Sequence, residues 1–254
     1  MSSDPSLAAQ TVVNSPSDGY TLLWCGVSNA KNATFYENLP FNFLKDIAPV
    51  SGAVVYPLVL EVHPSVPAKN VAEFITLAKA NPGKINMASF GTGSVSHLAG
   101  ELFKMGTGIN VMHVPFRGAA PMLTDLLGGQ VQVAIDTIAA SLPHIRSRAL
   151  RPLAVTTAAR LDALPHVPTV GETLADYEVV AWTGIGAPKG TPTAIVEKLN
   201  REINSGLTNP SIKARLTELT TVPLVLTPEQ FGSQMAAEIE RWGKVVKFSG
   251  AKPN

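Results

Sequence analysis

A glycine-rich turn with polar side chains separates a short apolar run from an amphipathic segment. Gly91-Thr92-Gly93 follows residues 85–89, and Ser94 is placed to cap a helix whose apolar residues recur at helical spacing. Glycines let the backbone turn sharply and approach a guest closely, while the unpaired amides and the dipole of a helix start favour negative charge. The turn is therefore suited to bind an anion. A turn that only caps its own helix is the alternative, and the sequence leaves both open.

The residues around this turn favour a carboxylate over a phosphate. The motif G-x-x-x-x-G-K-[ST] requires a lysine where this chain has Ser94, and G-x-G-x-x-G requires a glycine where it has Ser96. A carboxylate needs only a few amides and hydroxyls, which Thr92, Gly93 and Ser94 can supply. If the turn binds an anion, the sequence thus favours a carboxylate, and it predicts no cofactor.

Catalysis and metal binding are both disfavoured. Ser94 and His97 lie three residues apart and Asp136 follows a later strand, but G-x-S-x-G is absent and a capping hydroxyl is already engaged. His97 is instead expected to hydrogen-bond the backbone or a neighbour near the helix start. No enzyme and no metal site are expected, because none of the five histidines has the spacing of metal ligands: His63, His97, His113, His144 and His166.

Alternating strand-like and helical patterns predict an α/β protein with a largely parallel sheet. The carboxyl ends of parallel strands meet at one edge of the sheet, and the turns 89–94, 115–119 and 136–138 are expected there. At this edge Arg117 is either a partner for a second carboxylate or a solvated surface charge. Asp136 either accepts from a ligand amine or hydroxyl, or caps the helix that follows it.

The predicted elements run through most of the chain. Helices are expected from residue 71 to 80, from Ser94 to the glycines at 106 and 108, over 119–127, and after Thr191-Pro192 and Thr227-Pro228. Residues between 26 and 53 are expected to be irregular. Strands are expected over seven runs: 20–25, 54–62, 85–89, 110–114, 131–135, 153–156 and 179–182.

Composition bounds the class of protein further. The 254 residues carry a net charge of +1 and are 45% hydrophobic, which is typical of a globular chain and gives no sign of a nucleic-acid partner. No apolar run reaches the roughly 18 residues of a membrane helix. Cys25 is the single cysteine and is expected to be a buried small hydrophobe. The residues Met1 to Pro5 have no feature of a signal peptide.

A series of short motifs, in order along almost the whole chain, resembles one family. The motifs begin with Asp18-Gly19-Tyr20-Thr21-Leu22-Leu23, Asn81-Pro82-Gly83-Lys84 and His97-Leu98-Ala99-Gly100-Glu101-Leu102-Phe103. They continue with Leu123 to Val131, Leu153 to Thr157, Pro168 to Glu172, Gly186 to Pro192 and Arg241 to Val245. Together they resemble the Bug-type (tripartite tricarboxylate transporter) extracytoplasmic solute receptors.

This resemblance implies a fold like that of type II periplasmic binding proteins. Two lobes, each a mainly parallel sheet flanked by helices, would close on a small organic acid without catalysis. The first lobe would combine residues 1–64 with 183–254, and the second would hold residues 65–182. The implied ligand-binding residues are Gly26, Val27, Ser28 and Asn29 in the first lobe, and Phe90, Thr92, Gly93, Ser94, His97, Arg117, Gly118 and Asp136 in the second.

The resemblance also implies a location, a partner and a role. A periplasmic monomer would capture an amino-acid, dicarboxylic, tricarboxylic or aromatic acid and deliver it to the membrane permease subunits of a tripartite transporter. A sensor that presents the ligand-bound lobes to a signalling kinase is the alternative. Family members open with an export signal and with a strand, a glycine-rich loop and a helix of the first lobe, which this chain does not show. The first lobe is therefore expected to be incomplete, with an exposed sheet edge, either in a truncated receptor or in a relative that no longer binds.

Overall fold

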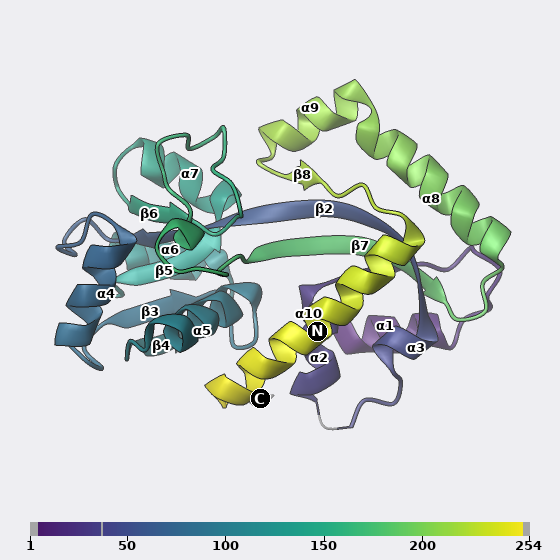
Figure 1. Cartoon of the computed structure of the whole chain (residues 1–254), viewed down its shortest axis with the longest axis horizontal. Helices are drawn as coiled ribbons and strands as arrows, with labels where there is room; N and C mark the ends of the chain where they lie inside the picture. The colour runs from purple at the N-terminus through teal and green to yellow at the C-terminus, as the bar shows by residue number, and fades with distance from the viewer. Residues whose placement is uncertain (1–4, 37, 251–254) are drawn as a thin grey trace. The chain divides into compact units, whose positions relative to one another are not determined.

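The computed structural model describes residues 5–36 and 38–250, in which helices and strands alternate (Figure 1). This confirms the predicted α/β class. The chain divides into two compact units. Unit 1 combines the described residues up to Val55 with those from Ala181 onward, and unit 2 is Tyr56–Val180. Two long strands, β2 (Ile47–Val62) and β7 (Val180–Pro188), contribute residues to both units.

The sheet of unit 2 is mixed, although four of its five strands run in one direction, as predicted. Its strand order is β6-β2-β5-β3-β4, in which β3 runs parallel to β4 and to β5. The exception is the second half of β2, which pairs antiparallel with β5 on one side and with β6 on the other. Besides β2, the strands are β3 (Asn86–Ser89), β4 (Met112–Pro115), β5 (Val133–Thr137) and β6 (Arg151–Val155).

The helices of unit 2 begin and end at residues that the sequence marks. Asn70 caps α4 by accepting the Glu73 amide at 2.8 Å, and α5 ends where Gly108 takes the left-handed conformation with φ 68°. Helices α5, α6 and α7 pack against the strands. The elements are α4 (Val71–Ala80), α5 (Val95–Thr107), α6 (Ala119–Leu127), α7 (Ile138–Arg146) and the 3₁₀ turn η1 (Val170–Glu172).

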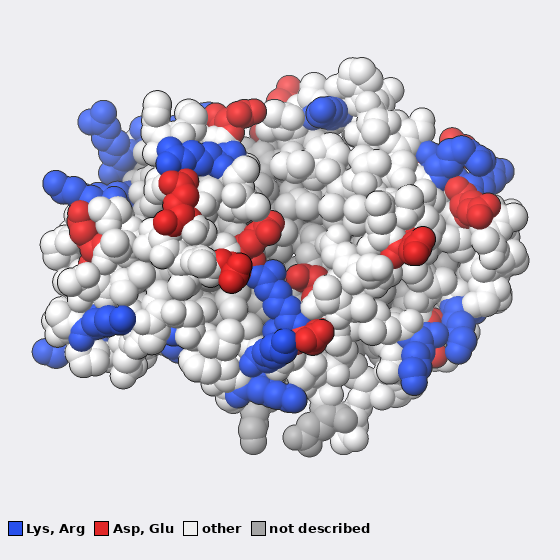
Figure 2. Space-filling view, viewed as in Figure 1, with Lys and Arg blue, Asp and Glu red and all other residues white. Residues whose placement is uncertain are grey.

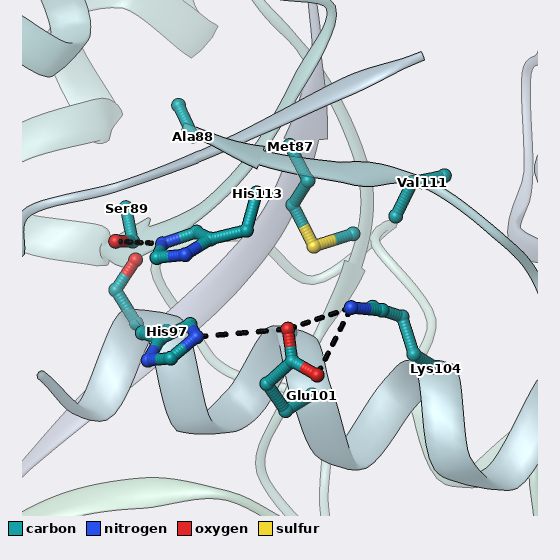
Figure 3. Close-up of a pocket in the computed structure, with 10 residues that line it drawn as sticks. Met87, Ala88, Ser89, His97, Glu101, Lys104, Val111 and His113 are labelled. Carbon is teal, nitrogen blue, oxygen red and sulfur yellow. Dashed lines mark hydrogen bonds and ion pairs between the residues drawn. The ribbon is translucent and has the colours of Figure 1, made fainter. Parts of the chain in front are cut away.

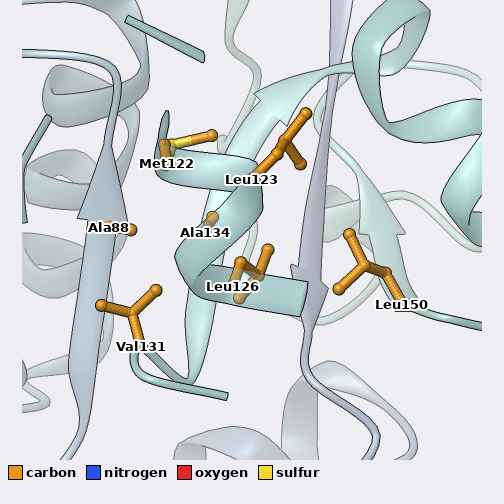
Figure 4. Packing of buried hydrophobic residues seen from close by; sticks show 7 residues of the cluster. All are labelled: Ala88, Met122, Leu123, Leu126, Val131, Ala134 and Leu150. Atoms are coloured by element: carbon orange, nitrogen blue, oxygen red, sulfur yellow. The ribbon is translucent and has the colours of Figure 1, made fainter. Parts of the chain in front are cut away.

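A buried apolar cluster holds α6 against the sheet of unit 2. Met122 and Leu126 on α6 are fully buried over β3 and β5, so truncating either to alanine should cost about 2–5 kcal/mol of stability (Figure 4). The cluster fixes the position of the turn that precedes α6. Its members are Ala88, Met122, Leu123, Leu126, Val131, Ala134 and Leu150.

The strand pairings of unit 1 differ from the mainly parallel sheet expected for the first lobe. Strand β1 (Leu23–Gly26) pairs antiparallel with β7, with Cys25 opposite Gly184. The first half of β2 pairs antiparallel with the short β8 (Val222–Pro223). Hydrophobic patterns locate strands, but the direction of a strand depends on its connections, which those patterns do not reveal.

The helices of unit 1 were partly missed by the sequence patterns. Thr227 caps α10 as predicted, since its hydroxyl accepts the Gln230 amide at 3.2 Å. Residues 26–53 are not irregular, because α2 and α3 lie there, and α2 packs along α10. Helix α2 was not recognised because it buries polar Asn29, Lys31 and Asn32. The helices are α1 (Pro5–Val13), α2 (Val27–Phe35), α3 (Phe43–Asp46), α8 (Thr193–Thr208), α9 (Pro210–Glu218) and α10 (Pro228–Ser249).

The surface has an exposed aromatic residue at one end of the strand order and a mixture of charges. Strand β1 stands at the end of the strand order, and its Trp24 is 58% exposed. On the face shown in Figure 2, lysines and arginines are interspersed with aspartates and glutamates. Within residues 5–36 and 38–250, no helix has an apolar stretch long enough to cross a bilayer.

Candidate functional site

Three turns of unit 2 reach the same level of the sheet. Ala88 on β3 lies opposite both Val114 on β4 and Ala134 on β5. Two residues further along each of these parallel strands come Phe90, Phe116 and Asp136, so the turns that follow share one edge, as predicted. The Phe116 amide donates to the carbonyl of Ser89 at 2.9 Å, which joins the first two turns directly.

The turn between β3 and α5 depends on its glycines. Gly91 has φ 137° and Gly93 has φ 71°, values that other residues adopt only at a cost. Ser94 is the N-cap, as predicted: its hydroxyl accepts the His97 amide at 3.2 Å, and its carbonyl accepts the Leu98 amide at 3.0 Å. By helix geometry, the amides of the two residues after the cap have no acceptor within α5. These amides and the positive end of the helix dipole can stabilise an anion.

His97 fixes the shape of this turn. Its Nδ1 accepts the Gly93 amide at 3.0 Å, and its Nε2 lies 3.6 Å from Glu101 Oε1. The prediction that His97 bonds the backbone is confirmed. Fewer groups are free to bind a ligand than the sequence predicted, however, because the Gly93 amide and the Ser94 hydroxyl both form hydrogen bonds within the protein. Ser94 bonds the amide of His97 rather than its ring, which is not the geometry of a serine nucleophile and its base.

A cluster of polar side chains lies behind the same turn (Figure 3). The rings of His97 and His113 stack with centroids 3.8 Å apart, and His113 Nε2 lies 2.7 Å from the Ser89 hydroxyl. Lys104 pairs with Glu101 at 2.8 Å. The space among these side chains does not admit a water-sized sphere. The cluster therefore supports the turn and offers no cavity for a ligand.

The electrostatics of this cluster follow from burial and contact. Burial, together with the neighbouring His97, lowers the pKa of His113 to about 4, so that its imidazole is neutral at pH 7. Burial alone would raise the pKa of Glu101, but hydrogen bonds from His97 and Lys104 outweigh it and hold this pKa below its ordinary value. Glu101 is thus an anion that orients the His97 ring.

The turn after β4 carries Arg117, the arginine among the predicted ligand-binding residues. Arg117 is exposed at this turn, and Gly118, with φ 114°, is the N-cap residue of α6. An exposed guanidinium beside two helix starts can reach a second carboxylate, since it offers a fork of donors to both oxygens. The structure thus places Arg117 at the predicted edge of the sheet.

Asp136 is at the expected edge but is completely buried. Its Oδ1 accepts the Thr137 amide at 2.7 Å, and its Oδ2 has no hydrogen-bond partner within the described part of the chain. Burial raises the pKa of Asp136 to about 6, although the bonds from Thr137 oppose this. The side chain thus faces inward and supports the turn into α7, rather than presenting a carboxylate at the surface.

The four candidate residues of unit 1 lie at the start of α2. Gly26 is the N-cap residue, and its amide donates to Asn29 Oδ1 at 3.1 Å. A side chain at Gly26 would collide with the carbonyl of Trp182. Ser28 is exposed, whereas Val27 and Asn29 are buried. The hydroxyl of Ser28 is therefore the group of this set that is open to solvent.

Unit 1 also contains a cavity that no candidate residue lines. Its volume is about 290 Å³, and α2, α3 and α10 contribute to its wall. The lining residues are Ala33, Tyr36, Leu39, Phe41, Asn42, Phe43, Leu44 and Ile239. In the ranges that the structure describes, no group of three or more histidine, cysteine or acidic residues could hold a metal ion.

Compact α/β units with helix starts at a common strand edge are suited to bind a small anion, and the comparisons show the family. The model for "Tripartite tricarboxylate transporter family receptor" matches residues 2–250. The chain belongs to this family, whose members are periplasmic solute-binding receptors and not enzymes. These receptors bind small organic acids and work with the permeases of tripartite transporters.

Individual relatives agree with this family. Protein BugT of Bordetella pertussis is 37% identical over 250 residues, which cover 97% of this chain and 76% of BugT. The structure of Rpa4515 of R. palustris with adipate is 37% identical, with a TM-score of 0.83 over 98% of this chain and 84% of that one. MatC of Rhodopseudomonas palustris with bound malate is 30% identical, with a TM-score of 0.79 over 95% and 84% of the two chains.

Proposed function

We propose that this chain captures a small carboxylate-bearing metabolite in the periplasm and delivers it to the permease subunits of a tripartite transporter. The family supports this role, and adipate and malate in two similar structures indicate the class of ligand. We further propose that the two compact units act as the two lobes of the receptor, with limits near those expected from the sequence: 1–64 with 183–254, and 65–182.

The observation that carries the proposal is the shared edge of the unit 2 sheet. There the first turn of α5 offers main-chain amides, the Thr92 hydroxyl is half-buried beside them, and Arg117 is exposed on the next turn. We propose that the amides and Thr92 bind one carboxylate and that Arg117 binds a second. Gly93, His97 and Asp136 hold these groups in place from within.

The remaining candidates complete the proposed contacts. Phe90 is half-buried at the start of the β3–α5 turn and can contact the carbon chain of the acid. In unit 1, we propose that the start of α2, from Gly26 to Asn29, is a separate contact region that offers the Ser28 hydroxyl. Within unit 2, a ligand that carries two carboxylates would use the α5 amides and Arg117 at once.

A matched pair of glycine variants tests the site in unit 2. Gly93→Ala and Gly108→Ala both place a side chain at a left-handed position of similar φ, one at each end of α5. Each should cost about 1–2 kcal/mol of stability. Only Gly93→Ala should weaken the binding of adipate and malate, by at least about tenfold, as measured by isothermal titration calorimetry on variants shown to be folded.

A second pair of variants tests the contribution of Arg117 to binding. Arg117→Gln should weaken adipate binding by roughly tenfold, whereas Arg146→Gln, at an exposed arginine in the last turn of α7, should not. The wild-type chain must bind at least one short mono- or dicarboxylate. If a folded chain binds none of a broad set, the receptor function is wrong, and if Gly93→Ala binds normally, the site lies elsewhere.

A further inference from the structure

Unit 2 buries two carboxyl groups next to each other behind the proposed site. Glu61 on β2 and Asp136 on β5 are both fully buried. In the antiparallel register Glu61 lies opposite Ala134, and Asp136 lies opposite Val59. Glu61 and Asp136 are therefore diagonal neighbours on one face of the sheet, close enough for their charges to interact. Two unpaired negative charges would be costly in such a place.

A hydroxyl hydrogen-bonds one of the two carboxyls. Ser141, fully buried on α7, donates from its Oγ to Glu61 Oε1 at 2.6 Å. Within the described residues, Glu61 Oε2 and Asp136 Oδ2 have no hydrogen-bond partner. One oxygen of each carboxyl is thus left for a proton.

The surroundings of the pair favour a single negative charge. Two fully buried carboxylates that are diagonal neighbours on one sheet face would repel each other, so one of the two carboxyls is expected to hold a proton. Burial is the main reason that the pKa of Glu61 rises to about 8, and the nearby Asp136 adds to the effect. At neutral pH the proton therefore lies on Glu61.

The surrounding charged groups do not neutralise the pair. Arg151 on β6 donates to the carbonyls of Val66 and Ala68, and His97, Glu101 and Lys104 on α5 interact with one another. On β4, His113 lies against the Ser89 hydroxyl. The last turn of α7 carries His144 and Arg146. No ion pair joins any described lysine, arginine or histidine to Glu61 or Asp136: the pairs found are those of Glu101, Glu172, Glu202, Glu218, Glu238 and Glu240.

We propose that Glu61 is a positioning residue that stores a proton and so keeps Asp136 as the single negative charge of this buried pair beneath the ligand-binding edge. The edge is close by, because Ser96 in the first turn of α5 donates to the carbonyl of Ile135, next to Asp136. When Glu61 loses its proton, a second negative charge appears near the bound acid. The effect on the ligand rests on the function proposed above, whereas the coupling of the two carboxyls does not.

Carboxyl ¹³C NMR of the full chain between pH 4 and 9 tests the coupling without any ligand. Asp136 should titrate near pH 6 and should shift again near pH 8, where Glu61 ionises. Glu61→Gln should abolish the second step and keep the first, because a glutamine does not ionise whereas Asp136 still does. Ser141→Ala should raise the titration midpoint of Glu61, because it removes the hydrogen bond that lowers the pKa of that group. Asp162→Asn, at an exposed carboxyl of the same unit, should change neither.

The ligand effect has its own readout. The affinity for adipate should fall roughly tenfold between pH 7 and pH 9, as expected for one added charge at about 10 Å near a protein surface, and Glu61→Gln should remove most of this fall. A Glu61 that is already ionised at pH 6, or an Asp136 resonance that ignores the ionisation of Glu61, overturns the proposal. If adipate does not bind at either pH, the proposed ligand fails, while the carboxyl titration still decides the coupling.

Discussion

Replacing Glu61 by glutamine should remove a large part of the pH dependence of stability. Glu61 is fully buried, and its pKa rises from 4.5 to about 8 in the folded protein. The unfolded chain loses this proton near pH 4.5, whereas the folded chain keeps it until about pH 8. The free energy of unfolding therefore falls as the pH rises through this range and levels off above it. The full difference is about 5 kcal/mol, from a shift of three to four pH units.

The informative window lies between pH 6.5 and pH 8. The pKa of His113 is lowered to about 4, so its contribution to the free energy of unfolding falls only as the pH drops below 6.5. The pKa of Asp136 is raised to about 6, so its contribution changes mostly below pH 6.5. In this window the wild-type chain should lose roughly 2 kcal/mol because of Glu61. Urea denaturation followed by tryptophan fluorescence at several pH values measures this loss directly.

The variant and a control complete the test. Glu61→Gln should be nearly flat between pH 6.5 and pH 8, because a glutamine cannot ionise. Asp162→Asn removes an exposed carboxylate of the same unit and should keep the wild-type slope. An equal slope in wild type and Glu61→Gln would mean that Glu61 is ionised in the folded protein, and the argument from burial would then be wrong.

Three further measurements test other parts of the structure. Cys25 is buried and its pKa is raised to about 12 by burial, so a thiol reagent at pH 8 should label it at least about 1,000-fold faster in urea than in buffer; rapid labelling of the native chain would contradict its burial. Gly184→Ala should cost about 1–3 kcal/mol, because the added carbon meets the Phe231 ring and the carbonyl of Ser51, and an unchanged urea midpoint would refute this close contact. The ring protons of His113 should not titrate above about pH 5 in NMR spectra, and a midpoint near 6.5 would contradict its lowered pKa.

The sequence predicted those elements whose boundaries are set locally. Helix α6 spans Ala119–Leu127, as expected from the glycines on either side, and the caps at Asn70, Ser94 and Thr227 were all found. Helix α2 was missed because its interior is polar, and its burial comes from partners distant in sequence. The strand directions of unit 1 were missed because they too depend on partners distant in sequence. At Thr191-Pro192 the predicted cap was one residue early, because Pro192 itself precedes the first helical residue.

The sequence predicted where the candidate site lies, but not how its side chains are oriented and hydrogen-bonded. The shared edge of the turns follows from the strand order, and the bond from His97 to Gly93 is a contact four residues apart that local spacing could suggest. The inward orientation of Asp136 and its link to Glu61 could not be predicted, because they depend on pairing between β2 and β5. One signal was present in the sequence: Glu61 is a lone acid in an otherwise apolar strand.

The hydrogen bonds around His97 have a thermodynamic consequence. Lys104, Glu101 and His97 form a continuous series of contacts along α5 that ends at the Gly93 amide. These contacts are all internal to the protein, so they hold the turn in shape without help from a guest, and little conformational entropy remains to be lost on binding. A few main-chain dipoles and hydroxyls on such a preorganised turn can then contribute useful affinity for a small anion.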